Sequence, residues 1–358
     1  MKRLLAISTA ALLFGNGCAS IKGGKMPNMA DMAALKEKIS QADAAAKESV
    51  KKCPAEDGNI PFEEEKQIGG AIMVGMAQEN GNLLLEPEPD QVLPELKTKP
   101  SDVVVKKGPR NDVNSYVGKI GRLLASYSTR PELPWVFGVI ENDSINAFSA
   151  PGGYVVITTG LMRLAENEAQ LAAILGHEIG HVVNKDVIKS YASVKHTICV
   201  PAVTAAAYIK YGVGDSLPAT VRSQADFAAE FDKPGLDPTS GGFIDALTNG
   251  VLSLRKTFGA GKDAEFAADK VGFELMMFAG YDTNEFDKVI RKAEQGGKSF
   301  NNHPGNVDRL KTFTTLRNGT GEGVEPADEL YKNFNTGGLA PAMPAEVKAA
   351  IPAETAAK

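Results

Sequence analysis

The chain has 358 residues, of which 43% are hydrophobic and 23% are charged, so it can bury one sizeable core with room for tails or a small second unit. The formal net charge is -5 at pH 7, and removal of Lys2 and Arg3 with an N-terminal signal makes the protein still more acidic. This charge balance argues against nucleic acid as the partner.

The N-terminus has the layout of an export signal: a basic start, an apolar run and small residues ahead of Cys18. We predict a signal peptide over residues 1–17, which is too short to span a membrane. A cysteine directly after a signal resembles the acylated cysteine of bacterial lipoproteins, so lipidation of Cys18 is favoured over plain secretion. The absence of an Asp next to Cys18 resembles lipoproteins of the outer membrane, which implies a periplasmic protein held there by a lipid anchor.

Residues 18–60 are predicted to form a lipoprotein linker, Gly-rich at first and then a helix rich in Ala, Lys and Glu over residues 31–52. The remaining cysteines are Cys53 and Cys199. In an exported protein such a pair is as consistent with a disulfide as with two free thiols, and their distance in sequence does not decide between these alternatives.

Helical periodicity returns in residues 63–78, which we expect to pack on a core, and again in residues 111–129. The proline-containing segment between them indicates a loop or insertion. The core-facing side chains predicted for the first of these helices are Ile68, Ile72, Val74 and Met76.

Two β-rich runs, residues 135–140 and 154–159, flank Asn146-Ala-Phe-Ser-Ala-Pro-Gly-Gly and predict a small sheet. Such a sheet could offer its edge to an extended peptide, which would bind by backbone hydrogen bonds whatever its sequence. The alternative is a purely structural hairpin.

The segment over residues 171–184 contains His177, Glu178 and His181 in the spacing H-E-x-x-H. On a helix, positions four apart lie one above the other, so both imidazoles can reach one metal ion while Glu178 sits beside it. The pattern is typical of zinc hydrolases. A core helix with two satisfied histidines is the alternative, but it leaves a charged Glu178 on a mostly apolar helix without a reason.

The start of this helix and the segments after it can also be predicted. Asn167 followed by Gln170 is a capping pair for its N-terminus. Residues 263–279 form a second strong helix, predicted to end at Gly280 in the left-handed conformation. Gly, Ala and Pro dominate residues 319–358, for which we predict a disordered tail.

An open catalytic zinc site usually has three protein ligands plus water, so the two histidines leave one ligand to be found. Glu265 and Asp269 lie four apart and share a face of the second helix. We expect Glu265 to bind zinc and Asp269 to accept the free N–H of a ligating imidazole, which fixes its tautomer and orientation. Without the first motif, a solvated helix face would be the preferred interpretation of both carboxylates.

Three motifs occur along the chain: Asn146-Ala-Phe-x-x-Pro-Gly-Gly, His177-Glu-Ile-Gly-His181 and, about eighty residues later, Glu265-x-x-x-Asp269. Together they resemble metallopeptidase family forty-eight, of the gluzincin group, over residues 62–315. The resemblance implies an α+β, mainly helical fold: a gluzincin-type domain with a small β-sheet beside the H-E-x-x-H helix. We therefore predict a zinc metallopeptidase domain over residues 61–318, most similar to the periplasmic lipoprotein members of the family.

A further element of that family, a downstream His-Pro, matches His303-Pro304, with Arg309 after it. The resemblance implies that His303 lines the cleft and helps to hold the oxyanion, whereas by itself a His before Pro would be an ordinary turn residue. The chain departs from the family after the first motif, where the usual Arg-His is Asn184-Lys185-Asp186. This departure puts any transfer of substrate preference in doubt.

The parts predict a zinc metalloendopeptidase with one zinc per chain, held by His177, His181 and Glu265. Zinc lowers the pKa of water and polarises the scissile carbonyl, and Glu178 takes the water's proton and passes it to the leaving amine. The resemblance and the export signal imply polypeptide substrates, bound in extended form, from among unfolded or misassembled cell-envelope proteins.

Two other functions fit parts of the sequence, and the oligomeric state is left open. One is a latent protease that serves as a chaperone or assembly factor for outer-membrane proteins, with residues 186–262 covering the zinc. The other is a zinc hydrolase of the deformylase kind, in which a Cys is the third zinc ligand. The sequence around Cys53 and Cys199 does not fit such a ligand, which argues against this alternative.

Overall fold

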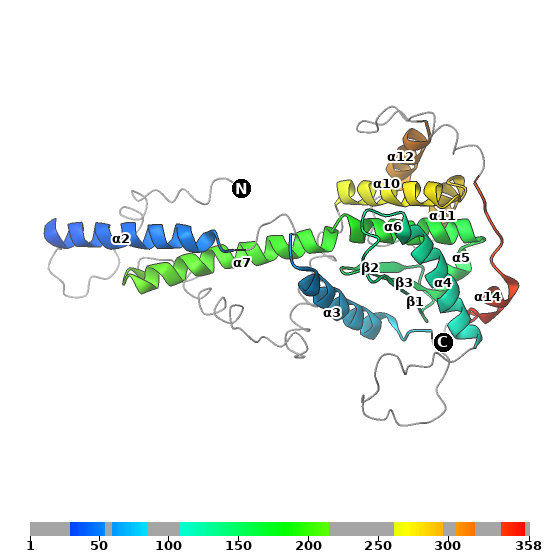
Figure 1. The fold of residues 1–358 in the computed structure, drawn as a ribbon, viewed down its shortest axis with the longest axis horizontal. Helices are drawn as coiled ribbons and strands as arrows, with labels where there is room; N and C mark the ends of the chain where they lie inside the picture. The colour runs from blue at the N-terminus through cyan, green and yellow to red at the C-terminus, as the bar shows by residue number, and fades with distance from the viewer. Residues whose placement is uncertain are drawn as a thin grey trace, which may run out of the picture. The chain divides into compact units, whose positions relative to one another are not determined.

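The computed structural model describes residues 29–53, 59–84, 108–214, 261–295, 306–318 and 338–354. The chain divides into two compact units, one formed by Met1–Asn59 with Ala192–Leu236 and the other by Ile60–Tyr191 with Asp237–Lys358. The described residues are mainly helical and contain a three-stranded sheet, so the predicted fold class is confirmed (Figure 1). The predictions for the signal peptide, Cys18 and His303 fall outside the described residues.

In the first unit, helix α2 (Met29–Val50) pairs with the distal part of helix α7 (Asp186–Lys210). Ala42 of α2 packs with Tyr208 and Val213, and the Tyr208 hydroxyl donates a hydrogen bond to Asp43. None of the described helices is long and apolar enough to cross a membrane.

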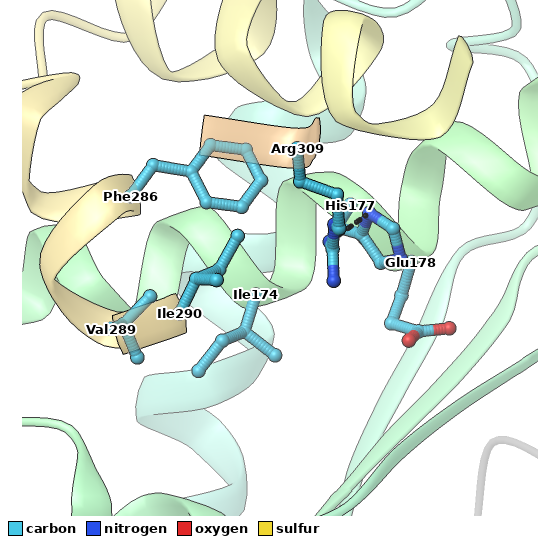
Figure 2. Close-up of a pocket in the computed structure, with 7 residues that line it drawn as sticks. All are labelled: Ile174, His177, Glu178, Phe286, Val289, Ile290 and Arg309. Carbon is cyan, nitrogen blue, oxygen red and sulfur yellow. Dashed lines mark hydrogen bonds between the residues drawn. The ribbon is translucent and has the colours of Figure 1, made fainter. Parts of the chain in front are cut away.

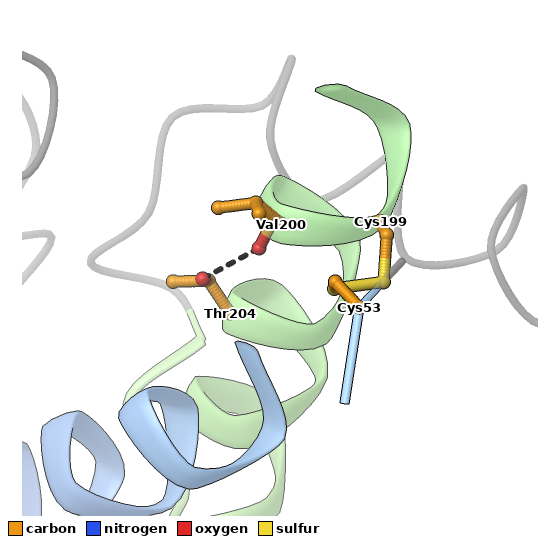
Figure 3. The surroundings of a disulfide bond; sticks show 4 residues. All are labelled: Cys53, Cys199, Val200 and Thr204. Carbon is orange, nitrogen blue, oxygen red and sulfur yellow. Dashed lines mark hydrogen bonds between the residues drawn. A yellow bond between two sulfur atoms is a disulfide. The ribbon is translucent and has the colours of Figure 1, made fainter. Parts of the chain in front are cut away.

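A disulfide between Cys53 and Cys199 links the end of α2 to α7 in this unit (Figure 3). The two Cα atoms are 5.8 Å apart, within the range that a disulfide spans, so the alternative of two free thiols does not apply. The bond closes a loop across 146 positions of sequence, and cross-links over long loops remove much conformational entropy from the unfolded chain.

The sheet of the second unit contains β1 (Val136–Ile140), β2 (Ala147–Ala150) and β3 (Tyr154–Thr158) in the order β1-β3-β2. β1 runs parallel to β3, and β2 pairs antiparallel with β3, from Ala147 opposite Ile157 to Ala150 opposite Tyr154. The sequence predicted β1 and β3 but not β2, because four residues of Ala, Phe and Ser give only a weak strand signal. As a terminal strand of the sheet, β2 is the one next to the H-E-x-x-H helix.

A two-glycine turn joins β2 to β3. Gly152 and Gly153 have φ angles of 81° and 94°, a backbone conformation that residues other than glycine rarely adopt. The amide of Gly152 donates to the buried carboxylate of Glu65, which also receives both arms of the Arg130 guanidinium at 2.8 Å. The turn is therefore tied to an ion pair between two other segments of the unit.

Alternate residues of each strand point to opposite sides of the sheet, and both faces are covered by other elements. Val139, Val155 and Ile157 face the core that contains helices α4 (Pro109–Ser126) and α6 (Glu168–Val183). The residues of the opposite face pack against helix α3 (Phe62–Asn80), and the cluster there includes Ile68, Ile72, Met76, Ile140, Phe148 and Val156.

The prediction that Val74 also packs on this core is wrong, since Val74 is 50% exposed. It lies about 200° around the helix from Ile72 and Met76, which occupy the buried stripe. The boundaries of the predicted helices otherwise agree with the observed elements, and Gly280 ends helix α10 (Lys262–Phe278) with a φ of 81°, as expected.

The prediction of a disordered tail over residues 319–358 is wrong for residues 338–354. This segment follows helices α11 (Asn284–Gln295) and α12 (Asn306–Asn318) and contains helix α14 (Ala345–Ala350). Met343 and Val347 join the main core with 3% and 4% exposure, and Glu168 at the start of α6 donates its amide to Pro341. The composition of the segment predicted disorder because composition does not show that Met343 and Val347 pack into the core of the domain.

Candidate active site

Helix α6 starts at the capping pair that the sequence predicts. The side chain of Asn167 accepts a hydrogen bond from the Gln170 amide at 2.9 Å, and Gln170 reaches back to the Glu166 amide at 3.0 Å. From Ala169 to Val182 every residue of α6 is buried. The polar side chains of the H-E-x-x-H motif are therefore held in the interior, where they need polar partners.

Helix α10 crosses α6 at backbone contact because both helices carry small residues at a spacing of four. These are Gly176 and Gly180 on α6 and Ala268 and Gly272 on α10. A Cβ atom on Gly180 would lie 2.6 Å from the carbonyl oxygen of Ala268, and one on Gly272 would lie 2.8 Å from the amide nitrogen of His177. Larger side chains would force the helices apart, so these residues allow the acidic face of α10 to reach the two histidines.

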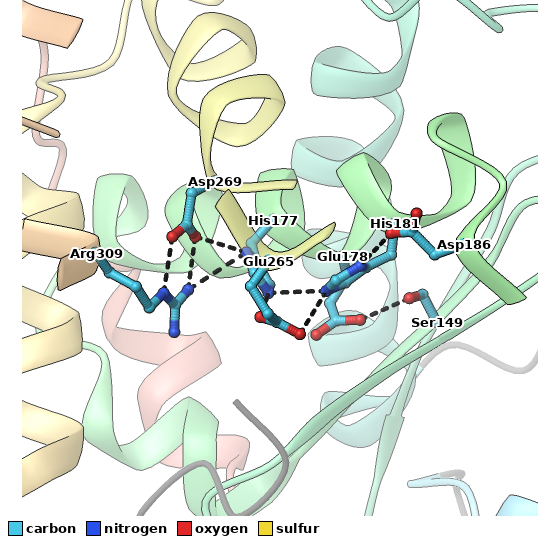
Figure 4. A network of polar contacts seen from close by, with 8 residues as sticks. All are labelled: Ser149, His177, Glu178, His181, Asp186, Glu265, Asp269 and Arg309. Atoms are coloured by element: carbon cyan, nitrogen blue, oxygen red, sulfur yellow. Dashed lines mark hydrogen bonds and ion pairs between the residues drawn. The ribbon is translucent and has the colours of Figure 1, made fainter. Parts of the chain in front are cut away.

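Glu265 from α10 faces both histidines (Figure 4). The Nε2 atoms of His177 and His181 are 3.1 Å apart, and the Glu265 carboxylate oxygens lie 3.4 Å from the first and 3.6 Å from the second. One donor atom from each of the three residues fits within 4.8 Å, and all three side chains are buried. Two imidazole nitrogens and one carboxylate are a donor set that suits a catalytic zinc or a similar transition metal.

The outer nitrogen of each imidazole contacts a carboxylate. Asp269 Oδ1 lies 2.8 Å from His177 Nδ1, which is the contact that the sequence analysis assigned to Asp269, and Asp186 Oδ2 lies 2.8 Å from His181 Nδ1. If Nδ1 carries the proton in both rings, the Nε2 lone pairs point toward each other and toward Glu265. That tautomer suits metal binding.

Arg309 from α12 holds the Asp269 carboxylate with a bidentate contact at 2.7 and 2.6 Å. Burial acts to raise the pKa of Asp269, while the hydrogen bonds with Arg309 and His177 hold it below its ordinary value. Burial acts to lower the pKa of His177, but hydrogen bonds to Asp269 and Glu265 outweigh it and raise that pKa to about 9. Negative charge dominates the cluster, which attracts a cation.

Glu178 lies on the same helix and faces strand β2. Its Oε2 atom accepts a hydrogen bond from the Ser149 hydroxyl at 2.7 Å, and Glu178 is 1% exposed. The bond fixes the carboxylate beside the metal-binding cluster (Figure 4). A carboxylate held in this way can accept a proton from a water that the cluster activates.

A small pocket opens beside His177 and Glu178, with apolar walls and a guanidinium at one side (Figure 2). The space is about the size of a water molecule and is walled by buried side chains of the core. The remaining lining residues are Ile174, Phe286, Val289, Ile290 and Arg309.

Three contacts of this site were not predicted from the sequence: those of Ser149, Asp186 and Arg309. Ser149 lies inside the Asn146 motif and Asp186 follows His181 by five residues, so both were in view without an assigned role. Arg309 was noted only as following His303, whose own position is outside the described residues. A signal for Ser149 and Arg309 was lacking because their contacts depend on how distant segments pack.

Comparisons with known proteins agree with this arrangement. The model of the family described as Peptidase family M48 matches residues 111–317. The chain is 27% identical over 180 residues to the "Beta-barrel assembly-enhancing protease" of Escherichia coli (strain K12), which is 50% of this chain and 32% of that protein. It is 29% identical over 180 residues to the "Putative beta-barrel assembly-enhancing protease" of Vibrio cholerae, with the same two shares.

The chain is also similar in sequence to a mitochondrial protein over a shorter stretch. It is 31% identical over 91 residues to the "Mitochondrial metalloendopeptidase OMA1" of Schizosaccharomyces pombe, which covers 25% of this chain and 27% of that one. This chain thus covers about a third or less of the length of these relatives. The family model nevertheless matches more than half of the chain and includes all residues of the metal-binding cluster, so the chain belongs to peptidase family M48, a family of metallopeptidases.

Proposed function

We propose that this protein is a zinc-dependent endopeptidase that hydrolyses peptide bonds in unfolded or misassembled proteins of the bacterial cell envelope. The observation that carries the proposal is the buried cluster of His177, His181 and Glu265 with Glu178 beside it. Two imidazoles, one ligating carboxylate and one further carboxylate are the set of groups that metal-assisted peptide hydrolysis requires.

In this proposal His177, His181 and Glu265 hold one zinc ion per chain. Asp269 and Asp186 accept the Nδ1 protons of the two imidazoles, at 2.8 Å in each case, and so keep both Nε2 atoms available as ligands. Arg309 balances the charge of Asp269. When bound, zinc supplies Lewis acidity, which lowers the pKa of water and polarises a carbonyl oxygen.

Glu178 acts as the general base and then as the general acid. It takes a proton from the attacking water and delivers it to the nitrogen of the leaving amine. The hydroxyl of Ser149, 2.7 Å from Glu178 Oε2, orients the carboxylate for both transfers. His303 remains a candidate for binding the oxyanion, as predicted from the family resemblance.

The substrates in this proposal are extended polypeptides that lie along strand β2. This strand is terminal in the sheet and its Ser149 touches Glu178, so a peptide paired with β2 by backbone hydrogen bonds would pass the metal-binding cluster. Recognition through the backbone tolerates many sequences, which suits a protease that removes damaged proteins.

An envelope location fits several observations together. The N-terminal export pattern and Cys18 predict a periplasmic lipoprotein at the outer membrane. The disulfide between Cys53 and Cys199 suits an oxidising compartment such as the periplasm. The names of the Escherichia coli and Vibrio cholerae relatives refer to β-barrel assembly.

Those names also favour a second candidate function, in which the protein is an assembly factor for outer-membrane proteins and its protease is latent. The groups needed for catalysis are brought together, so this candidate requires a covered site rather than an incomplete one. Of the cover proposed from the sequence, residues 186–262, the structure describes residues 186–214 and 261–262.

The test is zinc stoichiometry together with casein hydrolysis by protein that lacks residues 1–18. We expect one zinc per chain, cleavage that a chelator abolishes, and loss of at least about 10³-fold in kcat with retained zinc in Glu178→Gln. Peptide cleavage by a zinc-loaded Glu178→Gln protein would contradict the role of Glu178. One zinc with no cleavage by the wild type would favour the latent assembly factor.

A further inference from the structure

A second pocket adjoins His181, whereas the apolar one adjoins His177. It is bounded by strand β2 with the turn after it, by His181 at the end of α6, and by the first turn of α7. Its lining residues are Ser149, Ala150, Pro151, His181, Val182, Lys185, Val187 and Ile188. The pocket therefore adjoins both the strand proposed to pair with substrate and the metal ligand His181.

Lys185 is the residue of this pocket that is hardest to explain by folding alone. It follows the C-cap of α6 and has a φ of 58°, and it is the one described residue other than glycine with positive φ. Glycine is the usual occupant of that position because it adopts the left-handed conformation without strain. The chain keeps a long cationic side chain there despite the backbone cost, which suggests a role for the side chain.

The charge of Lys185 is not balanced by the pocket itself. No Asp or Glu lines the pocket, and no ion pair within 4.0 Å joins Lys185 to any carboxylate of the described residues. Lys185 interacts electrostatically with the Glu65 carboxylate, but that carboxylate also pairs with Arg130 at 2.8 Å, so two cations share one anion. Asp186 contacts His181. A cation that lines a pocket and shares its carboxylate with a second cation can attract an anionic ligand group.

We propose that this pocket is a substrate subsite for an acidic side chain and that Lys185 is the residue that selects it. The inference rests on the proposed peptidase function. His177, beside the apolar pocket, and Lys185 are eight residues apart on or just after α6, which corresponds to about 12 Å along the helix axis. An extended peptide covers that distance in about three to four residues. The preferred acidic residue should therefore lie within about three to four positions of the peptide residue bound beside His177.

The experiment compares kcat/KM for three peptides that differ only at the position expected to enter this pocket, with Glu, Gln or Lys there. A mixture-based peptide library first locates that position by sequencing the cleavage products. We expect the wild-type protein to cleave the Glu peptide about tenfold better than the Lys peptide. In Lys185→Glu the order should reverse.

Lys189→Glu is the matched control variant. Lys189 belongs to α7, one helical turn after Lys185, and it is exposed and does not line the pocket. The substitution Lys189→Glu therefore makes the same change in net charge outside the proposed subsite. Lys189 is exposed to water and salt, so its charge acts on the pocket more weakly than a charge that lines it. The ratio between the Glu and Lys peptides should therefore stay within about twofold of the wild-type ratio in this control.

The outcomes separate this inference from the proposed function. Cleavage of all three peptides with no charge preference, or an equal change of preference in Lys185→Glu and Lys189→Glu, would overturn the role of Lys185 and leave the peptidase intact. Failure of the wild type to cleave casein or any library peptide would instead overturn the proposed function, and this inference with it. Reversal confined to Lys185→Glu supports both.

Discussion

The two histidines of the H-E-x-x-H helix are supported in different ways. His177 contacts Asp269, which comes from another helix, is completely buried, and is paired with Arg309 from a third helix. His181 contacts Asp186, which follows it by five residues and whose side chain is 15% exposed. The contact of His177 with Asp269 depends on tertiary packing and a buried charge pair, whereas the contact of His181 with Asp186 is local and partly hydrated. Loss of these contacts should therefore change the free energy of unfolding and the metal affinity by different amounts.

The largest expected effect is on the buried pair. Arg309→Leu should lower the free energy of unfolding by about 3–5 kcal/mol, because it leaves the Asp269 carboxylate buried without its partner. Denaturation in guanidinium chloride, with a chelator present in all samples, separates this loss from any change in metal binding. The double variant with Asp269→Asn should recover part of the loss, and a single variant as stable as the wild type would show that the pair is not needed.

A smaller effect is expected at the second histidine. Asp186→Asn should weaken metal affinity by about tenfold, since the amide no longer favours the tautomer that presents His181 Nε2 to the metal. Stability without metal should change by less than about 1 kcal/mol, because Asp186 is partly hydrated. Competition with a chromophoric chelator measures the affinity. An effect equal to that of Asp269→Asn would remove the distinction between the two supports.

The smallest effect on the metal is expected from the ion pair between Glu65 and Arg130, which contacts no metal ligand directly. Burial acts to raise the pKa of Glu65, but the hydrogen bonds from Arg130 and the Gly152 amide outweigh it and lower that pKa below its ordinary value of 4.5. The carboxylate therefore stabilises the fold above about pH 4.5, and this contribution is lost as pH falls through the lowered pKa.

Glu65→Gln should flatten the decline of the free energy of unfolding below pH 4.5 and leave metal affinity at neutral pH within about threefold of the wild type. Chemical denaturation at several pH values and the same chelator competition provide the two measurements. A tenfold loss of metal affinity in this variant would mean that the turn after β2 is coupled to the metal-binding cluster.

Much of the second unit follows from local patterns in the sequence. The helices α3, α4, α6 and α10 have apolar residues at helical spacing, and α6 also has a side-chain cap at Asn167. Strands β1 and β3 are rich in β-branched residues. Strand β2 was not predicted because its four residues give a weak strand signal, although its partner β3 is next in the chain. The ordered segment over residues 338–354 was not predicted because it is stabilised by contacts with distant residues such as Glu168. Short segments carry too little local signal to outweigh composition.

The sequence by itself determined the chemistry of the site: the spacing of His177 and His181 on a helix and the acidic pair on α10. Only the tertiary structure decided that Glu265 faces both imidazoles, that Arg309 holds Asp269, and that Ser149 meets Glu178. The physical reason is that spacing within one helix is dictated by backbone geometry, whereas contacts between helices depend on how closely their backbones approach. Here that approach is set by glycine and alanine residues, whose effect is visible only once both helices are in place.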